Sequence, residues 1–123
     1  MKLKEISYIH SESYPAGELK HGSIALIENG VTVIGVMTDK DLVKKTVSNI
    51  QEVITRGAKT LVVSNQDIDK SMFDVVIDIS ETNCFVSPIL SIVPLQLLAY
   101  HISKEKGLDV DKPRNLAKSV TVE

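Results

Sequence analysis

The stretch VTVIGVM, residues 31–37, decides the fold of this chain. Its residues are β-branched and almost wholly apolar, which is typical of a strand buried on both faces of a sheet. In the segment 39–56 that follows, apolar residues recur at three- and four-residue spacing, which predicts an amphipathic helix. We expect Thr38 or Asp39 to cap that helix, and Gly57 to end it at the C′ position.

Two further apolar runs continue this alternation of strand and helix. TLVVS at 60–64 and VVIDI at 75–79 predict a second and a third buried strand. Ser87 and Pro88 open a last helix, with proline at its favoured first position. Strands that alternate with helices predict a parallel sheet with right-handed crossovers. We therefore expect an α/β protein with the three-layer, flavodoxin-like arrangement.

The two ends of the chain carry weaker helix signals. The last helix is apolar on most sides as far as Lys104, which predicts that it is buried. Pro94 lies inside this helix and is expected to kink it or to start it afresh, and Gly107 to end it. Residues 2–10 match the end of an amphipathic helix, and an extended piece with a tight turn or one helical turn is expected over 11–22.

Composition sets limits on the class of protein. The 123 residues suffice for one core, and 43% apolar with 24% charged residues is ordinary for a globular protein. A net charge of -2 gives a nucleic-acid partner no electrostatic support. The single cysteine, Cys84, fits a reducing cytosol, and its apolar neighbours predict a buried, inert thiol. Met1 is followed by no apolar signal sequence, and residues 85–100 are too short and too polar to span a bilayer.

Three runs of sequence resemble one family of enzymes. The tail DVDKPRNLAKSVTVE, residues 109–123, closely resembles the C-terminal tail of the glucosamine-6-phosphate synthases, the glutamine–fructose-6-phosphate aminotransferases. KLKEISYIHSESYPAGELKHG, residues 2–22, resembles the second sugar isomerase (SIS) subdomain of these enzymes. VPLQLLAYH, residues 93–101, resembles its last helix. Together the three runs reach from one end of the chain to the other.

The resemblance implies a domain organisation. Residues 1–108 are expected to form part of the second SIS subdomain, and residues 109–123 a catalytic tail. In the family, a glycine-rich strand that is internal to the sheet precedes the position of Lys2, as do the glutaminase domain and the first SIS subdomain. Met1 therefore falls inside a helix, where no domain boundary is expected. We expect this chain to be a piece of the isomerase domain, truncated at its N-terminus.

The resemblance implies that Lys118 forms a Schiff base with the sugar. A lysine must be neutral to attack a ketose carbonyl, so it needs desolvation or neighbouring positive charge. Arg114, four residues earlier, is a candidate for that charge. Without the resemblance, the favoured interpretation of Lys118 would be a solvated lysine in a tail.

The resemblance also implies that Glu5, the glutamate of KEISY, moves a proton between C1 and C2 of the sugar, and that Lys2 contributes to the same site. A carboxylate suits such a shuttle. The structural alternative is an exposed ion pair between residues three apart on a helix, which contributes about 0.2–0.5 kcal/mol.

His21 is the third residue to which the resemblance assigns a role. In the family, this histidine opens the hexose ring and reaches the site from the neighbouring subunit, and imidazole transfers protons near neutral pH. Ser23 stands where many members have proline, so the loop is expected to be less rigid. The structural alternative is a turn histidine bonded to the backbone. No residues have metal-ligand spacing, so neither a metal nor another cofactor is expected.

The function implied by the resemblance is that of part of a cytoplasmic, homodimeric enzyme. The enzyme converts fructose 6-phosphate and glutamine to glucosamine 6-phosphate and glutamate, and its sugar-phosphate loop lies in the first SIS subdomain. The isolated chain is therefore expected to be inactive without the rest of the enzyme. One alternative is a non-catalytic SIS module that binds sugar phosphate or oligomerises. Another is an SIS enzyme for a different sugar-amine phosphate, against which the intact NLAKSVTVE tail argues.

Overall fold

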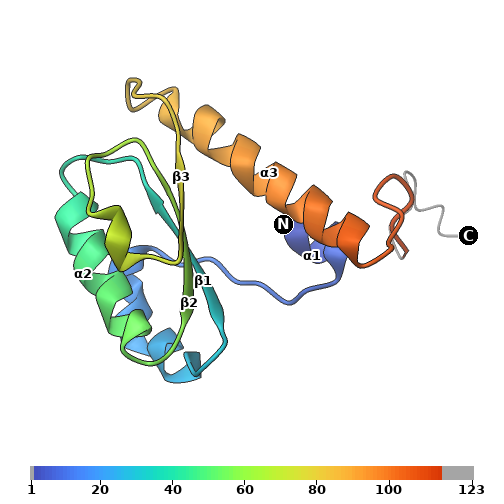
Figure 1. Cartoon of the computed structure of the whole chain (residues 1–123), viewed down its shortest axis with the longest axis horizontal. Helices are drawn as coiled ribbons and strands as arrows, with labels where there is room; N and C mark the ends of the chain where they lie inside the picture. The colour runs from blue at the N-terminus through green and yellow to red at the C-terminus, as the bar shows by residue number, and fades with distance from the viewer. Residues whose placement is uncertain (1, 115–123) are drawn as a thin grey trace, which may run out of the picture. The chain divides into compact units, whose positions relative to one another are not determined.

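The computed structural model describes residues 2–114. Figure 1 shows the course of the chain, with its helices and strands labelled. The elements in chain order are α1 (Lys2–Ser7), η1 (Ala16–His21), η2 (Ser23–Leu26), β1 (Thr32–Met37), α2 (Val43–Ile54), β2 (Lys59–Ser64), η3 (Lys70–Met72), β3 (Val75–Asp78) and α3 (Ser87–Glu105). The chain divides into two compact units, Met1–Glu12 with Leu95–Glu123, and Ser13–Pro94.

The three strands form one parallel sheet in the order β1-β2-β3. Thr32 stands opposite Lys59 where β1 and β2 begin to pair, and Leu61 stands opposite Val75 where β2 and β3 do. Helix α2 lies along one face of this sheet (Figure 1). The predicted parallel α/β arrangement is therefore confirmed, and each predicted strand lies within one residue of the observed one.

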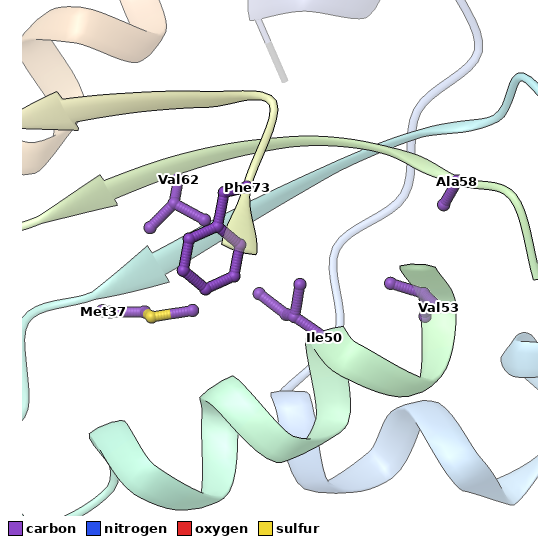
Figure 2. Packing of buried hydrophobic residues seen from close by; sticks show 6 residues of the cluster. All are labelled: Met37, Ile50, Val53, Ala58, Val62 and Phe73. Carbon is purple, nitrogen blue, oxygen red and sulfur yellow. The ribbon is translucent and has the colours of Figure 1, made fainter. Parts of the chain in front are cut away.

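The core of the Ser13–Pro94 unit lies between α2 and the sheet (Figure 2). Its side chains come from both β1 and β2, from α2, from the residue before β2 and from the residue after η3. They are Met37, Ile50, Val53, Ala58, Val62 and Phe73. Val53 and Val62 are completely inaccessible to solvent, and burial of a side chain of this size stabilises a fold by about 1.5–3 kcal/mol. This packing holds α2 against β1 and β2.

Helix α2 begins four residues later than the sequence predicts. Neither Thr38 nor Asp39 caps it: Leu42 occupies the N-cap position and makes no side-chain capping bond. Asp39 instead accepts a hydrogen bond from the backbone N–H of Asp41 at 2.8 Å, and its carbonyl accepts one from Leu42. An aspartate that bonds the backbone two residues on competes with helix formation. The predicted start of this helix was wrong for that reason.

The end of α2 agrees with the prediction. Gly57 has φ +85°, a left-handed conformation that L-residues rarely adopt. Its N–H donates to the carbonyl of Ile54 at 2.9 Å, and the next N–H, of Ala58, donates to Val53 at 3.2 Å. These two bonds form the Schellman motif. The same pair of bonds follows Gly107 at the end of α3, which confirms that prediction too.

At the N-terminus, the predicted helix over 2–10 is shorter than expected. Helix α1 stops at Ser7 because Tyr8 has φ 59°, which no helix can continue through. The helical turn expected near residues 17–22 is present as the 3-10 helix η1.

Helix α3 corrects one prediction and narrows another. It runs without a break through Pro94, so of the two predicted effects of this proline, a kink or a fresh start, the fresh start does not occur. It is also not buried on most sides: its buried residues are the small ones, Ser87, Ser91, Ala99 and Ser103, which recur at multiples of four. Larger apolar side chains stay exposed, including Ile89 at 63% and Leu97 at 52%. A helix that is apolar on all sides is buried only where other segments pack against every side. In the part of the chain that the structure describes, only the stripe of small residues on α3 is covered.

Cys84, just before α3, is exposed, so the prediction of a buried thiol was wrong. Its apolar neighbour Phe85 is 88% exposed and gives it no cover. An apolar stretch predicts burial only when the tertiary structure places other residues over it.

Candidate functional site

The carboxyl ends of β1 and β2 meet in a small hydrogen-bonded network. Ser64 donates through its hydroxyl to the carbonyl of Met37 at 2.9 Å, and the same hydroxyl accepts from the N–H of Gln66. The Gln66 amide donates to the carbonyl of Thr38 at 3.3 Å. Ligands of parallel α/β sheets bind at this edge. One buried donor here, Nδ2 of Asn65, has no partner among the described residues.

A cavity of about 350 Å³ opens beside this edge, in the Ser13–Pro94 unit. It lies between the segment before and within η1, the end of β1 and the first turns of α2. Its lining residues are Tyr14, Pro15, Ala16, Gly17, Val36, Met37, Thr38, Asp39, Leu42, Lys45, Thr46 and Asn49. The sequence patterns did not predict this cavity, because it forms where segments that are separate in the sequence meet in the fold.

Two contacts hold η1 beside α2. The buried Asn49 donates through its amide to the carbonyl of Ala16 at 3.0 Å, and Lys20 forms an ion pair with Glu52. These contacts fix the backbone around the cavity and place the end of η1 at the protein surface.

His21 is the last residue of η1, and its side chain is 73% exposed. Its Nδ1 lies 2.8 Å from Oε2 of Glu18. The structural alternative, a histidine bonded to the backbone, is therefore not the contact found. A carboxylate on one ring nitrogen orients the imidazole and leaves Nε2 for a proton transfer.

The predicted pair Lys2 and Glu5 lies on α1, in the other compact unit. The Lys2 ammonium is 3.0 Å from a carboxylate oxygen of Glu5, and the two side chains are 68% and 19% exposed. The Glu5 carboxylate is therefore largely covered and is held by one cation. This geometry fits both the ion pair and a proton shuttle.

The proposed Schiff-base lysine, Lys118, lies outside the described residues, which end at Arg114. Arg114 itself contacts Tyr8, directly after α1: its backbone N–H donates to the Tyr8 hydroxyl at 2.7 Å. Its guanidinium carbon stands 4.2 Å from the centre of the Tyr8 ring. The structure therefore brings Arg114 of the tail to Tyr8, which follows Glu5 by three residues in the sequence. Sequence patterns gave no signal for Tyr8.

Neither a metal centre nor a membrane span is evident within residues 2–114. No group of three or more His, Cys, Asp and Glu side chains there could hold a metal ion. No helix in the same range is long and apolar enough to cross a bilayer.

These features define a parallel α/β domain whose loops and cavity gather at the carboxyl edge of the sheet. The SIS domain model matches residues 1–103, and the chain belongs to this family. The parallel sheet with its helices is the SIS fold.

Curated proteins that are named as enzymes align with the whole length of this chain. A glutamine–fructose-6-phosphate aminotransferase (isomerizing) of Clostridium perfringens is 59% identical over all of this chain and 21% of its own length. The enzyme of the same name from Gloeobacter violaceus is 52% identical over all of this chain and 20% of its own length. The chain thus spans about a fifth of the length of the curated relatives it matches.

Solved structures are similar to this chain as well, among them the C-terminal domain of a glucosamine-fructose-6-phosphate aminotransferase from Francisella tularensis. The TM-score is 0.79 and the sequence identity 43%, over 90% of this chain and 32% of that one.

Proposed function

We propose that this chain forms part of the isomerase half of a glutamine–fructose-6-phosphate aminotransferase. The observation that carries the proposal is identity of 52–59% with enzymes of that name along the entire chain. The reaction joins an amino group from glutamine to fructose 6-phosphate and gives glucosamine 6-phosphate. Residues 1–108 would supply part of the second SIS subdomain, and residues 109–123 the catalytic tail.

The proposed chemistry begins at Lys118. Its neutral amine adds to the C2 carbonyl of the open-chain sugar, a C=N bond forms and water leaves. Ammonia released from glutamine then displaces the Lys118 amine from C2, which leaves the sugar with its own C=N bond and frees the lysine. Glu5 takes a proton from C1 and returns one to C2, which converts the ketose skeleton into that of an aldose. The position of Glu5 supports this role, since its carboxylate is mostly covered yet paired with Lys2 at 3.0 Å.

His21 would open the sugar ring by moving a proton from the anomeric hydroxyl to the ring oxygen. Its exposure at the end of η1 and the Glu18 carboxylate on its Nδ1 support a role at a surface that meets another subunit. A homodimer in which His21 serves the partner's site is the corresponding assembly.

The other partners and the location follow from the same proposal. The ligand is a sugar phosphate, whose phosphate would be held by the part of the full enzyme that this chain does not match. A cytoplasmic location is supported by Cys84, an exposed thiol of the kind that reducing compartments preserve.

A hybrid enzyme tests this function. In the Clostridium perfringens relative, the segment that matches this chain is replaced by the 123 residues. With fructose 6-phosphate and glutamine, the hybrid should form glucosamine 6-phosphate, whereas the hybrid with Lys118→Arg should not. The 123-residue chain alone should be inactive, because positioning contributes about 7–11 kcal/mol in well-oriented reactions and the phosphate anchor is missing.

Two results would contradict the proposal. A folded hybrid that binds fructose 6-phosphate without turnover would favour the non-catalytic SIS module. Turnover of a different sugar-amine phosphate in preference to fructose 6-phosphate would favour another SIS enzyme.

A further inference from the structure

Helix α1, which carries Glu5, is too short to be stable without support from outside it. It has six residues, Lys2–Ser7, and isolated helices shorter than about 12–15 residues are marginal in water. The chain cannot extend this helix further, because Tyr8 has φ 59°. The position of the Glu5 backbone therefore depends on contacts that other segments make with α1.

Lys106 makes such a contact at the end of α1. Its ammonium donates to the carbonyl of Ser7 at 2.6 Å, and Ser7 is completely inaccessible to solvent. The last carbonyl groups of a helix have no partner within the helix, and the negative end of the helix dipole favours a cation there. Lys106 supplies both the donor and the charge. It belongs to the same compact unit as α1.

Lys106 is itself fixed by the end of α3. Its N–H donates to the carbonyl of Ile102 at 3.1 Å, and the next residue, Gly107, ends the helix with a bond to Lys104 at 2.9 Å. The longer helix therefore presents this ammonium from a backbone that is held on both sides. Since Lys106 and Ser7 are 99 positions apart, no local pattern in the sequence predicts their contact.

A second lysine fixes the side chain of Glu5 within α1. The Lys2 ammonium is 3.0 Å from the Glu5 carboxylate, which leaves that side chain 19% exposed. Both residues belong to the same helix, so this ion pair orients the carboxylate relative to α1 but does not place α1 itself. Lys2 thus holds the side chain, and Lys106 holds the helix that carries it.

We propose that Lys106 is a positioning residue for Glu5; this inference rests on the proposed function, in which Glu5 moves a proton between C1 and C2. A general base must lie within hydrogen-bond reach of the proton that it removes. Misplacement by about 1 Å can lower a rate by about 10²-fold. Lys106 does not touch the sugar in this role, because it acts through the carbonyl of Ser7, on the same helix as Glu5.

Three substitutions separate the charge of this side chain from its stem. Lys106→Met removes the ammonium and keeps an unbranched apolar chain. Lys106→Arg keeps a cationic donor and should restore most of what the methionine loses. Lys104→Met is the matched control, because it removes an ammonium at the same end of α3 that stands over the Tyr100 ring, at 5.7 Å.

Amide hydrogen exchange of the 123-residue chain measures this anchor without any sugar. The N–H of Tyr8 donates to the carbonyl of Lys4 at 3.2 Å and closes the last turn of α1. The peptide that covers α1 and Tyr8 should exchange at least about fivefold faster in Lys106→Met, since local opening sets the exchange rate. Lys104→Met should match the parent, and α2, in the other compact unit, should not change. An unchanged rate for the α1 peptide in Lys106→Met overturns the inference.

Two rates in the hybrid enzyme measure the positioning itself. In borohydride trapping, hydride reduces the C=N bond of the proposed Schiff base with fructose 6-phosphate to a stable secondary amine, which mass spectrometry counts. Exchange of the C1 proton with deuterated solvent reports the action of Glu5. At saturating sugar, Lys106→Met should slow proton exchange by about 10- to 100-fold and change trapping by less than about twofold. Lys106→Arg should recover most of the exchange rate, and Lys104→Met should keep it.

A double variant shows whether Lys106 acts through Glu5. Proton exchange is already slow in Glu5→Gln, so the addition of Lys106→Met should slow it by less than about twofold more. General damage to the fold would instead lower the rate by the same factor whether Glu5 is present or not. Equal factors in the two backgrounds therefore overturn the positioning role.

Failure of this inference and failure of the proposed function give different results. Faster amide exchange of α1 with unchanged C1 proton exchange overturns the positioning role and leaves the proposed function standing, as does an equal loss of trapping and proton exchange. An unsubstituted hybrid that neither traps sugar nor exchanges the C1 proton overturns the proposed function, and this inference with it. If Lys106→Met does not fold, Lys106→Gln, which stays polar but lacks the ammonium, replaces it in every measurement.

Discussion

Gly35 on β1 lies so close to Ile50 on α2 that a β-carbon at position 35 would collide with the Cδ1 atom of Ile50. Ile50 is 4% exposed, and the Met37 and Val62 side chains already stand 3.6 Å from the same point. Glycine therefore lets α2 approach the centre of β1, so that Ile50 packs into the core shown in Figure 2.

Gly35→Ala should lower the free energy of unfolding by about 1–3 kcal/mol, because an added methyl overpacks a full core. Urea unfolding followed by circular dichroism measures this change. Ile50→Val removes the colliding Cδ1 atom, so the double variant should be more stable than the sum of the two single changes predicts. Gly17→Ala, where a β-carbon has no atom within 4 Å, is the control and should be close to neutral. Strict additivity in the double variant would contradict the packing argument.

Asp74 should make the stability of the fold depend on pH. The Thr60 N–H donates to its carboxylate at 2.7 Å and the Thr60 hydroxyl at 3.0 Å, and these bonds lower the pKa of Asp74 below its ordinary value. A folded pKa below the unfolded one stabilises the fold above the unfolded pKa, near 3.9, and this stabilisation is lost as pH falls through the folded pKa. Asp74→Asn should therefore be less stable than the parent at pH 7, with a difference that shrinks below about pH 4.

Urea titrations at pH 7 and pH 3 test this expectation. Thr60→Val removes the hydroxyl, which donates to the Asp74 carboxylate and accepts the Asp74 N–H, and keeps the bond from the Thr60 N–H to that carboxylate. It should therefore keep part of the pH dependence that Asp74→Asn loses. A difference between parent and Asp74→Asn that is equal at both pH values would refute the role of this carboxylate.

Lys118→Arg should abolish borohydride trapping of fructose 6-phosphate in the hybrid enzyme, because a guanidinium stays protonated and cannot form the imine. Intact-mass analysis reads the result directly. Lys112→Arg, in the same C-terminal segment, is the control and should trap at the parental rate. Trapping that survives in Lys118→Arg would assign the nucleophile elsewhere.

Glu5→Gln should separate the two halves of the chemistry. Imine formation needs no carboxylate at this position, so trapping should persist. Exchange of the C1 proton with deuterated solvent should fall by about 10²–10⁴-fold, the usual contribution of a general base. NMR of the recovered sugar measures the exchange, and normal exchange in this variant would show that another group moves the proton.

Association is the last prediction. Each of β1 and β3 has one edge that pairs with no other described strand, and large apolar side chains of α3 are exposed. Open edges and apolar surface both recruit other chains. The 123-residue chain should sediment as a dimer or larger species at high micromolar concentration, and a clean monomer there would count against the proposed assembly.

The sequence by itself determined the strands of the sheet and the glycines that end α2 and α3. The strand at 31–37 was predictable because β-branched, apolar runs of this length fit a buried parallel strand and little else. Gly57 and Gly107 were predictable because the left-handed helix terminus excludes most L-residues. The candidate residues Lys2, Glu5, His21 and Lys118 came from resemblance to known enzymes, since no local pattern marks them.

Only the tertiary structure decided the late start of α2, the exposure of Cys84 and of α3, and the contact between Tyr8 and Arg114. Asp39 could either cap a helix or bond the backbone two residues on, and in the structure it makes the second bond, to the Asp41 N–H. Exposure depends on which segments pack over a residue, so apolar neighbours alone could not reveal it. Tyr8 and Arg114 are 106 residues apart, and local spacing rules extend over only a few residues, so folding alone brings these two side chains together.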